Sequence, residues 1–483
     1  MTSPETEGYR IRRDRTLARL AELRQSSTMP MTQLEAVTLA SVRRVIDNAR
    51  VTIPYYREAF AGLADTARYT QLHDLMDDVP VLTRRNLQAS GPAMRNLPPS
   101  APTGLYVESH TSGATGQPVT VVKHAPSFTV DFDAATLLDW QWHQRPLDGA
   151  VVMFRVLNVD GSGPMGPPLS FINCLATAHW RSIATTTPAQ MVDLIHQVAP
   201  HTVFCNGVVL RQLCLEQGTS TRPAIGVARF VTVSDRIDGQ LRALVQDAFG
   251  GVIEDRYSSE ELGCIALQCP VHDHLHVVAA SMHIEILDDS GVPCVPGEPG
   301  RLLVTSLRHD AQPLIRYELG DRATWGESCD AGISWPVIER IEGRLRDGVT
   351  LPDGTFHMVT LTGSSLMLAP SIRDYVCVLF DDAVVVLVDA DGVLDPGLAV
   401  TIERDVALAF ALPRRVVVRQ MPISVVFGFW KRREWYQGIG GYAAGMSDEQ
   451  PVTYELQDGV AIITLRRPDK LNAVNRAMRQ GII

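Results

Sequence analysis

The run of hydroxyl and glycine residues from His110 to Pro118 is the part of the chain best suited to chemistry. Gly113 and Gly116 permit backbone conformations that bring N–H groups close to an anion. Three hydroxyl residues of the run can contact phosphate oxygens or Mg²⁺, namely Thr111, Ser112 and Thr115. The composition therefore indicates a phosphate-binding loop.

This run differs from a Walker loop at its end. A Walker loop carries lysine and then serine or threonine after its last glycine, whereas Gly116 is followed by Gln117 and Pro118. The sequence therefore argues against a P-loop nucleoside triphosphatase. Surface turns are rich in the same residue types, so the run alone leaves a turn and a phosphate loop both open.

Four later segments combine aromatic, acidic and arginine residues, and their order is more specific than any one of them. They are Val233-Ser234-Asp235-Arg236, Tyr257-Ser258-Ser259-Glu260-Glu261, Pro313-Leu314-Ile315-Arg316-Tyr317-Glu318-Leu319-Gly320-Asp321 and Ile341-Glu342-Gly343-Arg344. Together with the His110–Pro118 run and the segment Pro54-Tyr55-Tyr56-Arg57, they make the chain resemble the phenylacetate–CoA ligase family of adenylate-forming enzymes. The resemblance covers about residues 30 to 435.

The resemblance implies a role for each segment. His110–Pro118 resembles the family's phosphate signature, with Ala114 in place of one threonine. The implied nucleotide-binding residues outside this run are Ser234, Asp235 and Arg236 beside adenine, Tyr257 and Ser258 in the adenine motif, Glu261 at Mg²⁺, Asp321 on the ribose hydroxyls and Arg344 just before an interdomain hinge. Each residue alone is also typical of a turn, a helix start or a surface ion pair, and the shared order favours function.

The implied reaction is activation of a carboxylic acid by ATP. The carboxylate attacks the α-phosphorus, giving an acyl-adenylate, and a thiol, usually that of coenzyme A, then takes the acyl group. Negative charge accumulates at the phosphorus, so N–H groups, Mg²⁺ and an arginine are needed there. We expect Thr115 and Glu261 to hold the metal and phosphate, and Arg344 to act near the hinge. Two alternatives remain: transfer to a carrier-protein thiol or an amine, and a nucleotide-binding homologue without catalysis.

The chain departs from the family at its second-domain lysine. In the family this lysine follows a glycine and contacts the α-phosphate and the carboxylate, but here Phe429 follows Gly428. Lys431 serves this role if the loop is two residues longer. The other interpretation is a basic surface patch anchored by Trp430.

A second departure concerns zinc. Some relatives build a structural zinc site from Cys-Pro, a nearby histidine and a later Cys-x-Cys-Gly, and here the last cysteine has become Ala331. The resemblance implies Cys269, His276 and Cys329 as zinc ligands. Because structural zinc takes four N or S donors, Cys264 or His272 would complete the set. Exposed histidines and ordinary thiols are the alternative.

Elements of α/β type must position these residues. Helical spacing covers Met31 to Phe60, and short apolar runs at 151–156, 201–205, 230–233 and 251–255 alternate with helices such as 240–249. Strands and turns follow from Ser281 to Trp325, and further strands are expected at 375–380, 383–388 and 416–419.

We therefore predict an α/β fold with two functional domains. Residues 1–342 form a large adenylation domain with parallel sheets and a β-rich subdomain, and residues 343–437 form a small mobile α+β domain. A Gly-rich linker spans residues 438–451. The last segment, residues 452–483, resembles the opening hairpin of an enoyl-CoA hydratase (crotonase) domain, too short to catalyse, and its presence favours CoA as the acceptor.

Aromatic residues between the phosphate loop and the next strands suggest the acid. They are Phe128, Phe132, Trp140, Trp142, His143 and Phe154. An aromatic or bulky apolar acid is the natural expectation, although at least half of such residues are expected in the core.

Composition excludes several classes of partner. A formal net charge of −10 without a long basic run argues against nucleic acid, and no apolar run reaches the length of a membrane span. The start of the chain, Met1 to Arg10, shows no secretory signal, and eight scattered cysteines fit reduced thiols. We expect a cytoplasmic enzyme that binds ATP, Mg²⁺, coenzyme A and a small acid, and the resemblance implies a homodimer.

Overall fold

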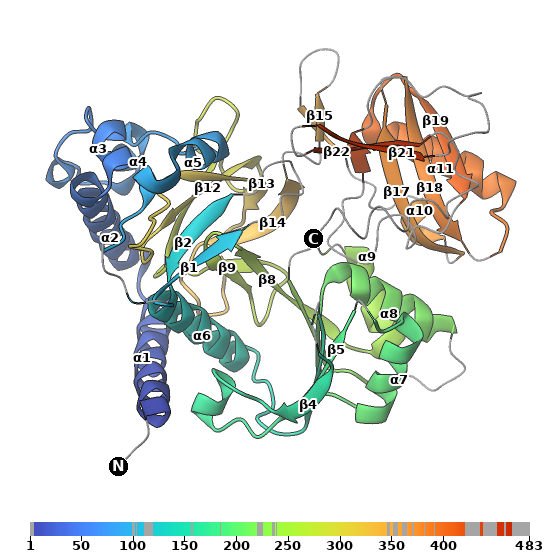
Figure 1. The fold of residues 1–483 in the computed structure, drawn as a ribbon, viewed down its shortest axis with the longest axis horizontal. Helices are drawn as coiled ribbons and strands as arrows, with labels where there is room; N and C mark the ends of the chain where they lie inside the picture. The colour runs from blue at the N-terminus through green and yellow to red at the C-terminus, as the bar shows by residue number, and fades with distance from the viewer. Residues whose placement is uncertain are drawn as a thin grey trace.

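The computed structural model of the protein describes residues 4–98, 102, 104–110, 119–155, 157, 159–183, 185–219, 226–233, 237, 239–344, 348–350, 356–359, 365–369, 371–380, 382–390, 392–420, 435–437, 452–457 and 460–465. Figure 1 draws the chain from the blue N-terminus to the red C-terminal hairpin.

The N-terminal region is helical. Its helices are α1 (Pro4–Ser27), α2 (Met31–Thr52), α3 (Pro54–Ala59), α4 (Leu72–Asp78) and α5 (Arg84–Ser90), with short 3₁₀ turns at Thr66–Arg68 and Gly91–Met94. The predicted helix from Met31 is confirmed, and it ends before Pro54, which starts α3 at a position where its missing N–H costs nothing. Tyr56 is buried, donates its hydroxyl to the carbonyl of Pro313 at 2.8 Å and accepts from the N–H of Ile315 at 3.2 Å. This turn therefore holds the later Pro313–Asp321 segment.

One mixed sheet of 12 strands forms the centre of the fold, in the order β11-β12-β13-β14-β10-β9-β8-β7-β6-β3-β5-β4. Its parallel half consists of β3 (Ala150–Arg155), β5 (Thr177–Ser182), β6 (Thr202–Cys205), β7 (Arg229–Val233) and β8 (Val252–Ser259), with β4 (Gly161–Pro164) antiparallel at the edge. The four predicted apolar strands of this half are confirmed. The predicted parallel and β-rich parts share a single sheet.

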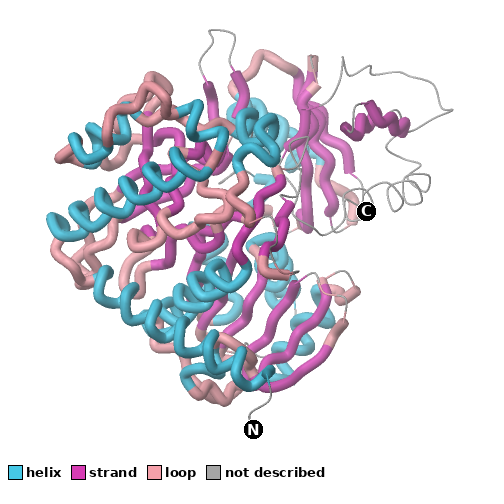
Figure 2. The backbone as a smooth tube through the Cα atoms, turned by 60° about the vertical axis from the view of Figure 1, so that its left-hand side comes forward, coloured by secondary structure: helices cyan, strands magenta, loops and turns pink. Residues whose placement is uncertain are grey.

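Helices cover both faces of the parallel half, as Figure 2 shows from the side. On one face lie α7 (Pro188–Val198), α8 (Gly207–Thr219) and α9 (Gly239–Phe249), and their apolar residues share a core with Val152 and Phe154 of β3. On the other lie α1 and α6 (Ala125–Trp142), which share a core with Val151. A 3₁₀ turn at Leu169–Ile172 lies between β4 and β5. No helix among the described residues is both long and apolar enough to span a bilayer.

The antiparallel half confirms the predicted strand-and-turn region. Its strands are β9 (Gly263–Gln268), β10 (Leu275–Val277), β11 (Met282–Leu287), β12 (Pro299–Ser306), β13 (Tyr317–Trp325) and β14 (Val337–Arg344). The turn after β11 forms because Asp288 Oδ1 accepts from the N–H groups of Ser290 and Val292, while Gly291 takes a φ of 88°. A separate antiparallel hairpin, β1 (Tyr106–His110) and β2 (Thr120–His124), brackets the predicted phosphate loop.

The C-terminal part contains a smaller sheet in the order β19-β18-β17-β20. Its elements are β17 (Ile372–Leu379), β18 (Ala383–Ala390), β19 (Arg415–Gln420), β20 (Trp435–Gln437), α10 (Ser365–Leu368) and α11 (Pro396–Phe410), preceded by the hairpin of β15 (Gly348–Thr350) and β16 (Phe356–Met358). The three predicted strands are confirmed. β21 (Val452–Gln457) and β22 (Val460–Leu465) pair as an antiparallel hairpin, the element predicted there, while its likeness to crotonases stays a prediction.

Candidate active site and candidate metal centre

Many of the predicted nucleotide-binding residues, and the predicted second-domain lysine, lie outside the described part of the chain. They are Thr111, Ser112, Gly113, Thr115 and Gly116 of the loop, Ser234, Asp235 and Arg236 of the adenine segment, and Lys431. Their flanks are described: His110 pairs with Thr120, so the loop joins the two strands of a hairpin. The roles of these residues remain predictions.

The fold brings Tyr257 and Asp321 together. The Tyr257 hydroxyl at the end of β8 donates a hydrogen bond to Asp321 Oδ2 at 2.5 Å, although 64 residues separate the two in sequence. Asp321 is buried on β13, where the backbone pairs it with Arg344 on β14. Gly320, immediately before it, has a φ of 88°, a conformation that favours glycine. Two predicted nucleotide-binding side chains are thus in contact, with the backbone of a third next to them.

Glu261 lies in the tight turn between β8 and β9, and its side chain is only 7% exposed. Its Oε1 is 3.6 Å from Nη1 of Arg84, the first residue of α5. The chain before α5 is fixed to β13, because the N–H of Leu82 donates to the carbonyl of Arg316 at 2.9 Å and its carbonyl accepts from Glu318 at 3.0 Å. A buried carboxylate beside cationic side chains is a suitable oxygen ligand for Mg²⁺.

Tyr317 lies against the same charges. Burial raises the pKa of its phenol, the nearby Glu261 carboxylate raises it further, and Arg84 opposes both effects. The phenol therefore stays neutral beside Glu261. Sequence reasoning missed Arg84; the available signal was the helix start at Thr83, whose hydroxyl accepts from the N–H of Asn86 in a capping box.

Lys123 and Glu260 form a second charged contact beside Glu261. Glu260 stands where the resembling family has serine or threonine, and its Oε1 is 3.4 Å from Nζ of Lys123. The Lys123 side chain is 5% exposed, and its ammonium lies 4.1 Å from the centre of the Phe128 ring. Burial lowers the pKa of Lys123, and the Glu260 carboxylate partly restores it. Sequence reasoning did not find this pair.

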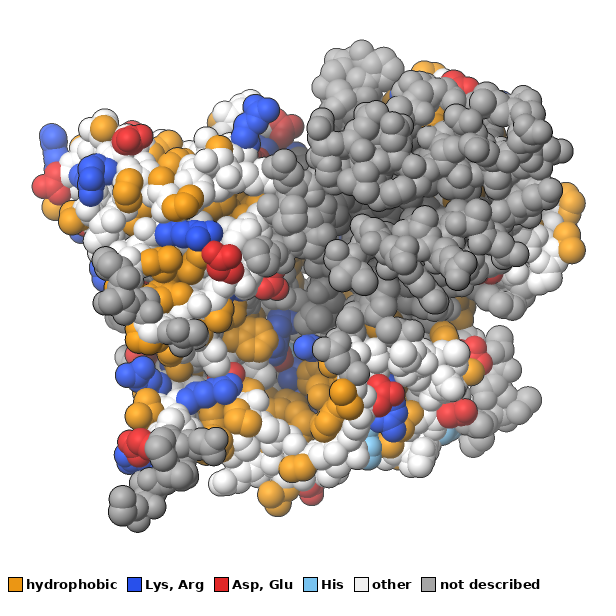
Figure 3. All heavy atoms as spheres, in the orientation of Figure 1, with side chains coloured by type: hydrophobic (Ala, Val, Ile, Leu, Met, Phe, Trp, Pro, Cys, Tyr) orange, Lys and Arg blue, Asp and Glu red, His pale blue; other side chains and the backbone are white. Residues whose placement is uncertain are grey.

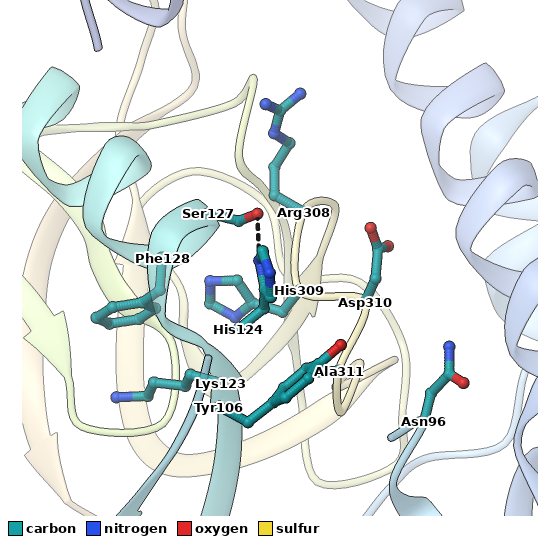
Figure 4. Close-up of a pocket in the computed structure, with 10 residues that line it drawn as sticks. All are labelled: Asn96, Tyr106, Lys123, His124, Ser127, Phe128, Arg308, His309, Asp310 and Ala311. Atoms are coloured by element: carbon teal, nitrogen blue, oxygen red, sulfur yellow. Dashed lines mark hydrogen bonds between the residues drawn. The ribbon is translucent and has the colours of Figure 1, made fainter. Parts of the chain in front are cut away.

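A cavity of about 260 Å³ opens beside Lys123, at the start of α6. Figure 4 shows Lys123, Phe128 and His309 around it, together with His124, whose Nδ1 lies 2.8 Å from Ser127 Oγ. Burial lowers the pKa of His309 to about 4. The cavity is therefore lined by aromatic rings and by charged side chains of both signs, namely Lys123, Arg308 and Asp310, and Phe128 is the predicted aromatic residue that faces it.

The other predicted aromatic residues divide between core and surface. Trp140 and Phe154 are buried in the cores on either face of the sheet, and His143 is buried beside Asp139. Trp142 packs against Trp335 with ring centres 5.5 Å apart. Phe132 is 40% exposed and lies under the guanidinium of Arg256. Of this set, Phe128 lines the cavity and Phe132 is exposed.

Four thiol and imidazole groups converge at a second place, between β9, β10 and the loop before β14. Ligand atoms of Cys269, His274, His276 and Cys329 all lie within 4.8 Å of one another. The two sulfur atoms are 3.8 Å apart. Two thiolates on a tetrahedral zinc ion with Zn–S near 2.3 Å are expected about 3.8 Å apart. The separation is far too long for a disulfide and fits a shared metal ion.

The surroundings of this cluster also suit a metal. The Nε2 atoms of His274 and His276 are buried and have no hydrogen-bond partner in the described part of the chain. His276 Nδ1 donates to the carbonyl of Trp335 at 3.2 Å, which leaves Nε2 with its lone pair. Backbone N–H groups of His272 and Ala331 donate to the sulfur atoms of Cys269 and Cys329, both at 3.4 Å. These contacts stabilise thiolates.

The structure brings together the three predicted zinc residues and changes the expected fourth. His274 takes the place for which Cys264 or His272 was expected, and His272 instead pairs with Asp330, 2.5 Å away. The reason is strand register: His276 pairs with Leu267 on β9, and the N–H of Cys269 donates to the carbonyl of His274. Sequence spacing alone does not distinguish the three histidines.

No protein-family model matches the chain, and no curated protein matches it. Solved structures do. A structure of 2-hydroxyisobutyryl-CoA ligase in the postadenylation state, in complex with R3-HIB-AMP, superposes with a TM-score of 0.69 at 16% identity, covering 95% of this chain and 94% of that one. An open conformation of the same ligase, in complex with 2-HIB-AMP and CoA, gives a TM-score of 0.58 at 17% identity over 85% of this chain and 93% of that one.

These matches extend over nearly the whole length of both chains, so they concern the arrangement of all the large elements. The α/β class, with a strand-rich part and a smaller α+β part after it, is the class predicted from the sequence, while the structure joins the predicted parallel and β-rich parts in one mixed sheet. The chain has the fold of the adenylate-forming CoA ligases.

Proposed function

We propose that this protein activates a carboxylic acid with ATP, through an acyl-adenylate, and transfers the acyl group to coenzyme A. The observation that carries the proposal is the contact of Tyr257 with Asp321, with Glu261 in the next turn. In the resembling family these positions serve adenine, ribose and Mg²⁺. Solved structures with the same fold are named as CoA ligases in complex with acyl adenylates and CoA, which supports the same class of reaction.

The described residues fit the electrostatic demands of adenylation. Tyr257 and Asp321 would bind the nucleoside, and Glu261 with Thr115 would hold Mg²⁺, which offsets charge on the phosphates. Arg84 lies beside Glu261 and positions its carboxylate, while Tyr317 stays neutral there. Arg344 and Lys431 would act on the phosphates as the small domain, residues 343–437, closes about the hinge.

Pyrophosphate release tests the proposal. The protein, ATP and Mg²⁺ are incubated with a panel of aromatic and fatty acids, with and without coenzyme A. Release that depends on one class of acid and is accompanied by a CoA thioester supports the proposal. Release without any thioester favours a carrier-protein or amine acceptor. ATP binding without release for any acid favours a homologue that has lost catalysis, and a Lys431→Ala variant shows whether that lysine takes part.

We also propose that Cys269, His274, His276 and Cys329 hold a structural zinc ion. Two thiolates and two neutral imidazoles are a donor set typical of structural zinc. The cluster ties β9 and β10 to the loop before β14, so metal binding would stabilise the antiparallel half of the sheet.

Metal analysis of the purified protein tests the zinc proposal. We expect one zinc per chain, a loss of zinc in Cys329→Ser and His274→Ala, and a lower melting temperature after treatment with a strong chelator. His272→Ala is the matched control, because His272 pairs with Asp330, and it should retain zinc. Wild-type protein purified without zinc, and unable to bind added zinc, would contradict the assignment.

A further inference from the structure

Arg155 is an arginine at the carboxyl edge of the parallel strands with no partner among the described residues. It is the last residue of β3, where the backbone pairs it with Ser182 at the end of β5. Ligands of open α/β sheets bind in the crevice outside the carboxyl ends of the strands. The guanidinium of Arg155 therefore begins at the edge of the sheet where a ligand is expected.

The side chain points to the face of the sheet covered by α6. Val152 and Phe154 of β3 belong to the core beneath α7, α8 and α9, while Val151 belongs to the core beneath α6. Because side chains alternate along a strand, Arg155 shares the side of Val151. Arg256 of β8 points the same way, since it donates to Asp139 and Thr136 of α6 and lies over the Phe132 ring. Exposed Phe132 of α6 and Arg155 thus lie on the same side of the sheet.

The buried acids Asp139 of α6 and Glu254 of β8 are paired with other arginines. Asp139 accepts from Arg145 at 2.9 Å and from Arg256 at 2.7 Å. Glu254 accepts from Arg145 and Arg229. Arg155 has no carboxylate partner among the described residues. Although it is solvent exposed, desolvation by the surrounding protein lowers its pKa, and repulsion from Arg256 lowers it further. An ordinary surface arginine is fully hydrated, whereas this cation is partly desolvated and lies within the field of a second cation, Arg256. Figure 3 shows Lys and Arg side chains within the hollow of this face.

Distance separates Arg155 from the reacting carboxyl group. Tyr257 and Glu261, which mark the adenylation site, belong to β8 and the turn after it, and the order β3-β6-β7-β8 places β3 three strands away. At nearly 5 Å between neighbouring strands, the backbones are about 14 Å apart. A carboxylate reacting near Glu261 is therefore too far to be the group that Arg155 binds.

We propose that Arg155 determines acid specificity by pairing with a second anionic group, a carboxylate, at the far end of the acid. This inference rests on the proposed function and narrows its substrate class to dicarboxylic acids. The interior of such an acid would lie along Phe132. Arginine suits this role because its planar guanidinium takes a carboxylate with two parallel hydrogen bonds.

Matched acids test the inference. Aliphatic dicarboxylic acids of graded length and carboxy-substituted arylacetic acids are compared with monocarboxylic acids of equal length, using pyrophosphate release. Wild type should favour the diacids by at least tenfold in kcat/KM at one length. Arg155→Leu should lose that preference mainly through KM while keeping its rate with monoacids, and Arg155→Lys should keep part of it. Arg13→Leu, which removes an exposed charge on α1, is the control.

Some outcomes would overturn the inference. These are a wild-type preference for monoacids, an equal loss on both acid classes in Arg155→Leu, or a change confined to the KM of coenzyme A. Equal melting temperatures of the variants establish folding. Calorimetric titration with the diacids separates this inference from the proposed function. Diacid binding to wild type and not to Arg155→Leu supports the inference even if no acid releases pyrophosphate, and absence of diacid binding to wild type overturns it.

Discussion

At the scale of single residues, the carboxylate of Glu261 has an ion-pair partner in Arg84. Arg84 Nη1 is 3.6 Å away, and its side chain is 33% exposed, so the pair contributes little to stability. Its effect should appear in catalysis, because Glu261 lies where Mg²⁺ and the phosphates are expected. We therefore expect Arg84 to matter through its position beside Glu261 and not through the stability that the ion pair contributes.

We expect Arg84→Ala to lower kcat/KM for ATP about tenfold, which is roughly 1.4 kcal/mol of transition-state stabilisation, while the free energy of unfolding changes by less than about 1 kcal/mol. The measurement is pyrophosphate exchange together with chemical denaturation. Arg85→Ala is the matched control, since Arg85 is the next residue of α5 and is exposed, and it should stay within about twofold of wild type. Equal effects of both substitutions would remove the role assigned to Arg84.

At the scale of elements, the turn from α2 to α3 supports the segment that carries Asp321. The buried Tyr56 hydroxyl bridges the carbonyl of Pro313 and the N–H of Ile315, and burial raises its pKa. Tyr56→Phe leaves both backbone groups without this partner in a water-free place. We expect a loss of about 1 to 3 kcal/mol in unfolding free energy, measured by denaturant titration. Tyr55→Phe, at a half-buried neighbour, should cost less than about 0.5 kcal/mol; a similar cost would contradict the bridging role.

The elements also show what sequence can and cannot predict. Strands around Val151, Phe230 and Ile253 follow from short apolar runs, whereas the nucleotide-binding roles that the ordered motifs assign to Tyr257, Glu261 and Asp321 stay predictions. Apolar runs and motifs are signals contained within short stretches of the sequence. Arg84, Lys123 and His274 were missed because their roles arise from contacts between distant segments. Lys123 reaches Glu260 only once β2 lies over the turn after β8, and His274 joins the metal cluster through the register of β10 on β9.

Prediction of the acid substrate from the sequence is limited in the same way. Six aromatic residues suggested an apolar acid, but the fold buries Trp140 and Phe154 in its cores. Burial of this kind depends on which face of a strand or helix meets a neighbour, and clustered aromatic residues do not reveal it. The unpaired Arg155 became informative only when the ion pairs of Asp139 and Glu254 were known.

At the scale of the whole molecule, half-buried neutral histidines link stability to pH. Burial lowers the pKa of His283 to about 4, with the Arg316 cation adding to the effect. His309 has a pKa of about 4 for the same main cause; Lys123 and Arg308 lower it further, and Asp131 and Asp310 oppose them. In the unfolded chain both would titrate near 6.5. Between pH 6.5 and 4, unfolding therefore takes up a proton at each histidine.

The contribution of these histidines is complete above pH 6.5 and is lost as pH falls toward 4. Each should give a slope of about 1.4 kcal/mol per pH unit in that window. Denaturant titrations at several pH values would measure it in wild type, His283→Gln and His309→Gln. A variant is expected to be less stable at neutral pH, but its stability should fall less steeply with acid than that of wild type.

The cysteine–histidine cluster is common to all three proteins, so any acid release of metal cancels in the comparison of slopes. Parallel pH profiles for wild type and both variants would mean that these imidazoles have the same pKa in the folded and unfolded protein, and the acid sensitivity would then have to arise from other groups.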